Sequence, residues 1–180
     1  MKTRFAFPLL LFTVVGTTLP AQAADDADPE VRPGIPVSEG EMTPKVLGLV
    51  RRGDSLRAAL RFPEAQQAYT QAAEIARREG HLPSRSMWLL ANAYYNEGNT
   101  VRAAAVMDQL TNEAGRVGDL PVQALALFNA AWLNGQVGRT PEATARVTRL
   151  ERLLRSPYMP IAIRDHLTGR LNSPSEVATQ

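Results

Sequence analysis

The sequence contains no cysteine, only two histidines and few aromatic residues, which make up 6% of its 180 residues. Without cysteine there can be no disulfide framework, no lipid-anchored cysteine behind an export signal and no cysteine nucleophile. The two histidines, His81 and His166, lie too far apart in the chain to show a metal-ligand spacing. A phosphate-binding loop and a nucleophile elbow are also missing. We therefore expect a protein that is not an enzyme, with no catalytic residues, no metal site and no cofactor.

Long apolar runs are absent except at the N-terminus, where Phe5 to Val15 is almost wholly apolar. Lys2 and Arg4 precede this run, and Ala21-Gln22-Ala23 matches the small-x-small pattern of a signal-peptidase site. A membrane anchor is the alternative, but the run is far shorter than the roughly 20 residues that span a bilayer. The pattern predicts a signal peptide over residues 1–23, cleaved after Ala23, and a soluble protein exported to a bacterial periplasm.

The charge is uneven along the chain. Loss of Lys2 and Arg4 with the signal leaves 18 basic and 18 acidic residues, so the balance does not favour nucleic acid as a partner. Residues 24–41 carry six acids against one base, and the remainder carries 17 bases against 12 acids. Few large apolar residues and several prolines predict that residues 24–42 form a disordered acidic arm. This arm could be a simple tether, or it could lie over basic residues of the body.

Apolar spacing predicts helices through most of residues 43–171, beginning at the capping pair Thr43-Pro44. The clearest stretch is 86–110, which reads as two helices joined at Glu97-Gly98-Asn99. Small residues, Ala91 and Ala103, fall where these two helices would cross. We expect further breaks at 80–83, 118–121 and 156–157, a terminal helix at about 160–171, and a flexible tail at 172–180.

One turn motif occurs three times, at Leu60 to Ala65, Gly98 to Ala103 and Gly138 to Ala143. The alanines that end these motifs, here named the repeat alanines (Ala65, Ala103 and Ala143), are 38 and 40 residues apart. A period in this range is typical of stacked helical pairs.

The pattern resembles the tetratricopeptide repeat (TPR) over roughly residues 45–154. The central repeat supplies Met87, Leu90, Ala91, Tyr94, Ala103 and Met107 at the characteristic positions. The flanking repeats depart from it at Arg52 and Asn134, and the period exceeds the 34 residues of the family. The resemblance implies an all-α fold: a short solenoid of about three TPR-like helical hairpins, closed by a C-terminal capping helix that covers the last repeat.

In TPR stacks the first helix of each pair lines a concave groove. Carried over to the aligned positions, this geometry implies a peptide-binding groove formed by Arg51, Asp54, Arg57, Trp88, Asn92, Tyr95, Asn96, Phe128, Asn129, Trp132 and Gln136. Tyr94, next to Tyr95, falls on the buried side of the pattern.

Two kinds of recognition are open for this groove. Asn92 and Asn129 resemble the asparagines that hold a terminal carboxylate in clamp-type members of the family, although Trp88 stands in place of the usual lysine. The aromatic residues would also suit a more general peptide groove. Alternatively, the capping helix buries Phe128 and Trp132, and no such groove exists.

Taken together, these patterns predict an exported, non-catalytic adaptor that binds a protein or peptide segment in its concave groove. The alternative is a self-associating scaffold whose aromatic surface forms a homodimer.

Overall fold

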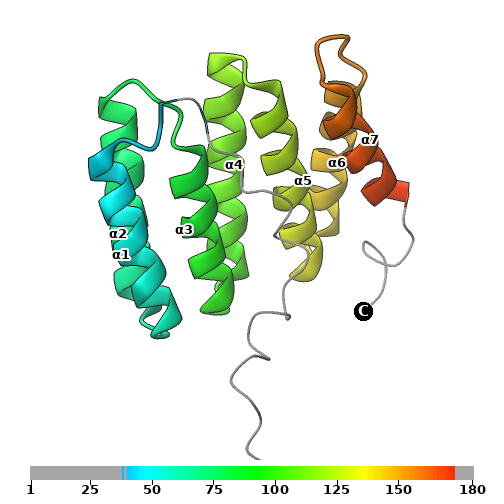
Figure 1. The fold of residues 1–180 in the computed structure, drawn as a ribbon. Helices are drawn as coiled ribbons and strands as arrows, with labels where there is room; N and C mark the ends of the chain where they lie inside the picture. The colour runs from blue at the N-terminus through cyan, green and yellow to red at the C-terminus, as the bar shows by residue number, and fades with distance from the viewer. Residues whose placement is uncertain (1–37, 39, 173–180) are drawn as a thin grey trace, which may run out of the picture. The chain divides into compact units, whose positions relative to one another are not determined.

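A computed structural model of the protein describes residues 38 and 40–172. These residues form helices joined by short turns, as expected for an all-α fold (Figure 1). No helix in this part of the chain combines the length and the apolar character needed to cross a membrane. The helices are α1 (Pro44–Ala58), α2 (Phe62–Arg78), α3 (Ser84–Asn96), α4 (Thr100–Val117), α5 (Leu120–Gln136), α6 (Thr140–Leu154) and α7 (Ile161–Asn172). The signal peptide predicted at 1–23 and the tail residues 173–180 lie outside the described residues.

The repeated turn motif ends the first helix of each pair in the same way. Gly98 and Gly138 adopt the left-handed conformation, with φ angles of 87° and 71°, and Leu60 has the same conformation with φ 58°. In the central turn, the Gly98 and Asn99 amides donate to carbonyls of the last turn of α3. Leucine pays a steric penalty in this region that glycine avoids. The turn is therefore set by its position in the fold, even where the residue is unfavourable.

Side chains cap two of the helix starts, and the first of these is the cap expected at Thr43. The Thr43 hydroxyl accepts from the Val46 amide at the start of α1, and the Asn99 side chain accepts from the Arg102 amide at the start of α4. Each bond satisfies one of the amides that a helix N-terminus leaves without a partner inside the helix.

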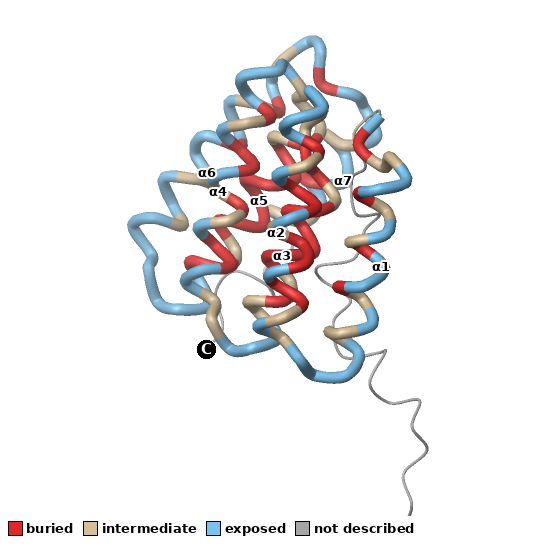
Figure 2. The backbone as a smooth tube through the Cα atoms, turned by 90° about the vertical axis from the view of Figure 1, so that its left-hand side faces the viewer, coloured by how far each residue is buried: buried red, intermediate tan, exposed pale blue. Residues whose placement is uncertain are grey.

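Small side chains fill much of the space between the helices. Two of the repeat alanines, Ala65 and Ala103, are completely buried, as is Tyr69 of α2. Buried residues lie where helices face one another, and exposed residues cover the outer turns (Figure 2). The third repeat alanine, Ala143, is only half-buried, because α6 buries few residues of its own. The third pair therefore covers its repeat alanine less completely than the first two pairs do.

Each helix from α1 to α6 packs mainly against its neighbours in the sequence, in order across Figure 1. Two ion pairs also join the even-numbered helices. Arg77 of α2 pairs with Glu113 of α4 at 3.0 Å, and Arg146 of α6 donates to Asp108 of α4 at 2.8 Å. Positions on the three helices can be compared by counting residues from the repeat alanine of each helix. In both ion pairs, the residue on the later helix is two positions closer to its repeat alanine than the residue on the preceding helix. Successive even-numbered helices are therefore displaced by the same step.

Helix α7 is held against the end of α6 by one arginine. The Arg164 guanidinium donates to the carbonyls of Leu154 and Ser156, at 3.0 and 2.9 Å. A cation is favourable at this place because the last carbonyls of a helix carry partial negative charge. Leu167 of α7 is buried, and α7 also contacts α5. The terminal helix thus forms at residues 161–172, close to its predicted bounds.

The expected disorder of residues 24–42 is wrong for the end of that range. Glu41 is fully buried and binds the N-terminus of α3, and the Ser38 amide donates to the Ser84 hydroxyl at 2.8 Å. Gly40 lies against the ring of His81. The rest of the predicted arm, 24–37 and Glu39, lies outside the described residues. The acid-rich composition did not reveal that its last carboxylate is part of the folded domain.

Candidate binding surface on helices α1, α3 and α5

Tyr95 of α3 and Trp132 of α5 form an aromatic pair. Their ring centroids are 5.5 Å apart and the planes are tilted by 53°, a favourable arrangement for two aromatic rings. Both side chains remain partly exposed. Trp132 occupies the place on α5 that Asn92 occupies on α3, and Gly135 corresponds to Tyr95. Two of the expected groove residues are therefore in contact.

Two other expected groove aromatics are part of the core, and their assignment to the groove is wrong. Trp88 is completely buried and Phe128 is only 9% exposed. The two residues lie at equivalent positions, 40 residues apart. The guanidinium of Arg170 in α7 lies 5.5 Å from the centre of the Phe128 ring. Capping by α7 therefore covers Phe128, as the alternative expected, but leaves Trp132 partly open.

Trp88 is buried because α3 is covered on more than one side. From Ser84 to Ala91 every residue of α3 except Arg85 is buried, including the polar Ser84 and Ser86. A helix that is buried all round has no single solvent-facing stripe. The one-face pattern used to assign groove positions therefore fails at this end of α3.

The proposed asparagine clamp does not form. Asn129 is 6% exposed, and its amide nitrogen donates to the Leu125 carbonyl of its own helix at 2.9 Å. Asn134 does the same with Ala130 at 2.7 Å. An asparagine that is buried and bonded to its own helix cannot hold a partner's carboxylate. Asn92, the other proposed member, is half-buried on α3.

The expected residues of α1 divide into two groups. Asp54 accepts a hydrogen bond from the Tyr69 hydroxyl at 2.7 Å, and Arg57 lies beside the same phenol. Burial raises the pKa of Tyr69 well above its usual value, and the nearby Asp54 carboxylate raises it further. Gly53 packs directly on the ring of Tyr69, where any side chain would collide with it. Asp54 and Arg57 therefore support the packing of α1 on α2, whereas Arg51 is exposed and separate from them.

The remaining expected residues, Asn96 and Gln136, are exposed near the C-terminal ends of α3 and α5. With Asn92, Tyr95 and Trp132 they leave a smaller surface than the sequence implied. This surface offers two aromatic rings and several amides, which suit contacts with a peptide backbone and its apolar side chains. We name Asn92, Tyr95, Asn96, Trp132 and Gln136 the aromatic surface.

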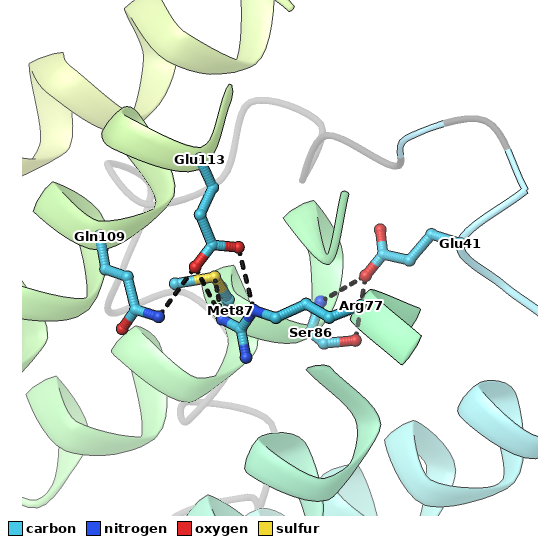
Figure 3. A network of polar contacts seen from close by, with 6 residues as sticks. All are labelled: Glu41, Arg77, Ser86, Met87, Gln109 and Glu113. Atoms are coloured by element: carbon cyan, nitrogen blue, oxygen red, sulfur yellow. Dashed lines mark hydrogen bonds and ion pairs between the residues drawn. The ribbon is translucent and has the colours of Figure 1, made fainter. Parts of the chain in front are cut away.

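A buried carboxylate at the start of α3 was missed by sequence reasoning. Helix α3 has no capping side chain of its own, because Pro83 precedes it. Glu41 takes that role: one carboxylate oxygen accepts from the Ser86 amide and hydroxyl, at 2.9 and 3.0 Å (Figure 3). The other accepts from the Arg85 amide and the Ser84 hydroxyl, both at 2.9 Å. The residue before α3, Pro83, offers no capping side chain, so the first amides of this helix are available to an acceptor from elsewhere in the chain.

A second polar network in the same region also has a structural role. Arg77 forms an ion pair with Glu113 and also contacts the Met87 sulfur (Figure 3). Glu113 in turn accepts a hydrogen bond from the Gln109 side chain. Among the described residues, no group of three acidic or histidine side chains is arranged to hold a metal ion. The polar side chains that converge here join helices to one another.

Comparison with known proteins found no matching family model and no similar curated protein or solved structure.

Proposed function

We propose that the chain is a TPR-like adaptor, a short solenoid of about three helical hairpins that binds a protein or peptide segment without catalysis. The equivalent turns at Leu60, Gly98 and Gly138 support the repeat, as does the equal displacement of α2, α4 and α6. Stacked pairs of this kind present an extended surface on their first helices. In this chain those helices are α1, α3 and α5.

The observation that carries the binding function is the partly exposed pair of Tyr95 and Trp132. Tyrosine and tryptophan are enriched among the residues that dominate the energy of protein interfaces. The pair contacts across two helices, so its rings are already held in place before a partner arrives, which lowers the entropy cost of binding. The neighbouring amides of the aromatic surface can bond the backbone of an extended segment.

Replacing Trp132 or Tyr95 by alanine should weaken partner binding while the fold persists. The free energy of unfolding should fall by about 1 kcal/mol in each variant, because an aromatic pair contributes about 0.5–1.5 kcal/mol to stability. Affinity should fall about thirtyfold, as expected for an anchor worth about 2 kcal/mol. The partner would be isolated by co-purification with the exported wild-type protein and then titrated against each variant by calorimetry.

Val101→Ala supplies the control, because it truncates another exposed apolar side chain on the even-numbered helix α4. Equal losses of affinity in all three variants would contradict a specific aromatic surface. Gel filtration distinguishes the alternative function: if wild type elutes as a dimer and the aromatic variants as monomers, the pair serves self-association.

We further propose that the protein acts outside the cytoplasm, most simply in a bacterial periplasm, after cleavage of a signal peptide. The support is the sequence from Lys2 to Ala23, which lies outside the described residues. N-terminal sequencing of the protein recovered from its native cells should begin at Ala24. Recovery of a cytoplasmic protein that retains Met1 would contradict export.

A further inference from the structure

Positive charge is concentrated at the C-terminal end of the described residues. Residues 139–172 contain seven arginines and three acidic residues, whereas residues 40–138 contain ten basic and nine acidic residues. The net charge of +4 in the shorter segment thus exceeds the +1 of the much longer one. The basic character therefore belongs mainly to α6, α7 and the loop between them.

Three of these seven arginines already have structural partners. Arg146 pairs with Asp108, Arg164 binds the carbonyls at the end of α6, and Arg170 lies over Phe128. The others include Arg149, Arg152 and Arg155, which are exposed and make no ion pair within residues 40–172. Arg152 Nε donates to the Thr148 carbonyl of its own helix. The spacing of three residues between these exposed arginines places them within about a third of the circumference of α6.

The same side of α6 contains a hollow. Arg149, Arg152, Leu153 and Ser156 line a shallow depression at the end of the helix. When residues are counted from the repeat alanines, Gly115 of α4 corresponds to Arg77 of α2. Leu153 of α6 likewise corresponds to Glu113 of α4. The ion pair that joins α2 to α4 at this level therefore has no counterpart between α4 and α6.

The loop that follows this hollow, together with the first residue of α7, presents apolar side chains in a fixed conformation. Tyr158 is 84% exposed and Ile161 is 70% exposed. Met159 between them is buried, and the Arg164 guanidinium binds the carbonyls of Ser156 and Met159. Arginine and tyrosine are both enriched at protein interfaces. An exposed tyrosine on a loop that is held at both sides therefore can anchor a partner at low entropic cost.

We infer that α6 and the α6–α7 loop form a second docking surface, which binds an acidic protein segment carrying at least one apolar side chain. Charge complementarity selects the acidic residues of the partner, which would face Arg149, Arg152 and Arg155. Leu153, Tyr158 and Ile161 would take the apolar side chain. A protein segment fits better than a flat lipid surface because two of the arginines, Arg149 and Arg152, line a depression together with Leu153 and Ser156. This surface is independent of the aromatic surface on α3 and α5.

The probe is a fluorescein-labelled octapeptide of six acidic residues around one Leu and one Phe, titrated by fluorescence anisotropy against the mature full chain. Binding should weaken about tenfold or more between 50 and 300 mM salt, since exposed charge pairs are screened. The double variant R149E/R152E should bind at least tenfold more weakly than wild type, and Y158A severalfold more weakly. R149Q/R152Q, which removes charge without reversing it, should show an intermediate loss.

The control is R51E/R52E, which makes the same charge change at two exposed arginines of α1. If this variant keeps its affinity for the peptide, the assigned surface is supported. A loss of affinity as large as that of R149E/R152E would mean that the peptide is attracted nonspecifically by positive charge, and would overturn the inference. Tighter binding to phosphatidylglycerol vesicles or to DNA than to the peptide would also overturn it. The aromatic-surface variant W132A should bind the probe normally, so failure of the proposed adaptor function and failure of this inference give different results.

Discussion

Replacing Trp88 by alanine should lower the free energy of unfolding by about 3–5 kcal/mol, the usual cost of removing a large buried aromatic side chain. Trp88 is completely buried in α3, and its neighbours in the sequence, Met87 and Leu89, are also buried. The loss combines the transfer of apolar surface with the cavity that remains. Since a domain of this kind is stable by only about 5–15 kcal/mol, the midpoint of urea unfolding should shift substantially. Circular dichroism would follow the transition, because each variant alters the tryptophan fluorescence.

Trp132→Ala is the matched control, since it makes the same chemical change at a partly exposed position on the next odd-numbered helix. Its loss should be several times smaller than that of Trp88→Ala. In addition, the variant Trp132→Phe retains Trp88 as its single tryptophan. The fluorescence of that variant should resist quenching by acrylamide. Equal stability of the two alanine variants, together with ready quenching of Trp88, would place Trp88 on the surface after all.

Replacing Glu41 by alanine should destabilise the domain by about 2–3 kcal/mol, although this residue lies outside every helix. The substitution leaves two backbone amides of α3 and two serine hydroxyls without their buried acceptor. Hydrogen bonds to a charged group contribute about 1.5–3 kcal/mol, and a buried donor left unsatisfied costs a similar amount. The negative charge at a helix N-terminus adds to this effect. Urea unfolding measures the loss.

The site of the damage can be located by hydrogen exchange. In Glu41→Ala the amides of Arg85 and Ser86 should exchange faster than in wild type, while amides in the middle of α5 change little. Glu41→Gln should show a smaller loss, because it keeps one carbonyl oxygen as acceptor but presents an amide donor to the other pair of donors. Glu151→Ala, an exposed acid on α6, should stay within about 0.5 kcal/mol of wild type. If Glu41→Ala resembles Glu151→Ala, the buried cap does not contribute to stability.

Local features of the fold were accessible from the sequence because they depend on residues close together in the chain. The turn at Gly98 needs a left-handed residue and the start of α4 needs a cap, which Asn99 provides three positions after the end of α3. Small residues at the crossing, such as Ala91 and Ala103, are required wherever two helices approach closely. These requirements act within one helical pair, so they can be recognised from a stretch of about 40 residues.

The candidate site was predicted only in part, because exposure depends on neighbours that the pattern does not include. Tyr95 and Trp132 are on the expected side and in contact, whereas Trp88 and Phe128 are on equivalent positions and buried. Arg170 from α7 covers Phe128, although more than 40 residues separate the two. Asn129 bonds its own helix, which no spacing rule distinguishes from an asparagine that faces a ligand.

The sequence by itself determined the helices and the turn motif that recurs between them, since hydrophobic spacing and turn chemistry are local properties of the chain. Only the tertiary structure decided which polar and aromatic side chains remain accessible. Glu41 shows the reason most clearly, because in the sequence it belongs to an acid-rich stretch that was expected to be disordered. Helix α3 begins after Pro83 without a side-chain cap of its own, and its first residue, Ser84, binds the Glu41 carboxylate from 43 residues away. Burial and hydrogen bonding between distant segments are set by how the helices pack, and that packing is cooperative over the whole domain.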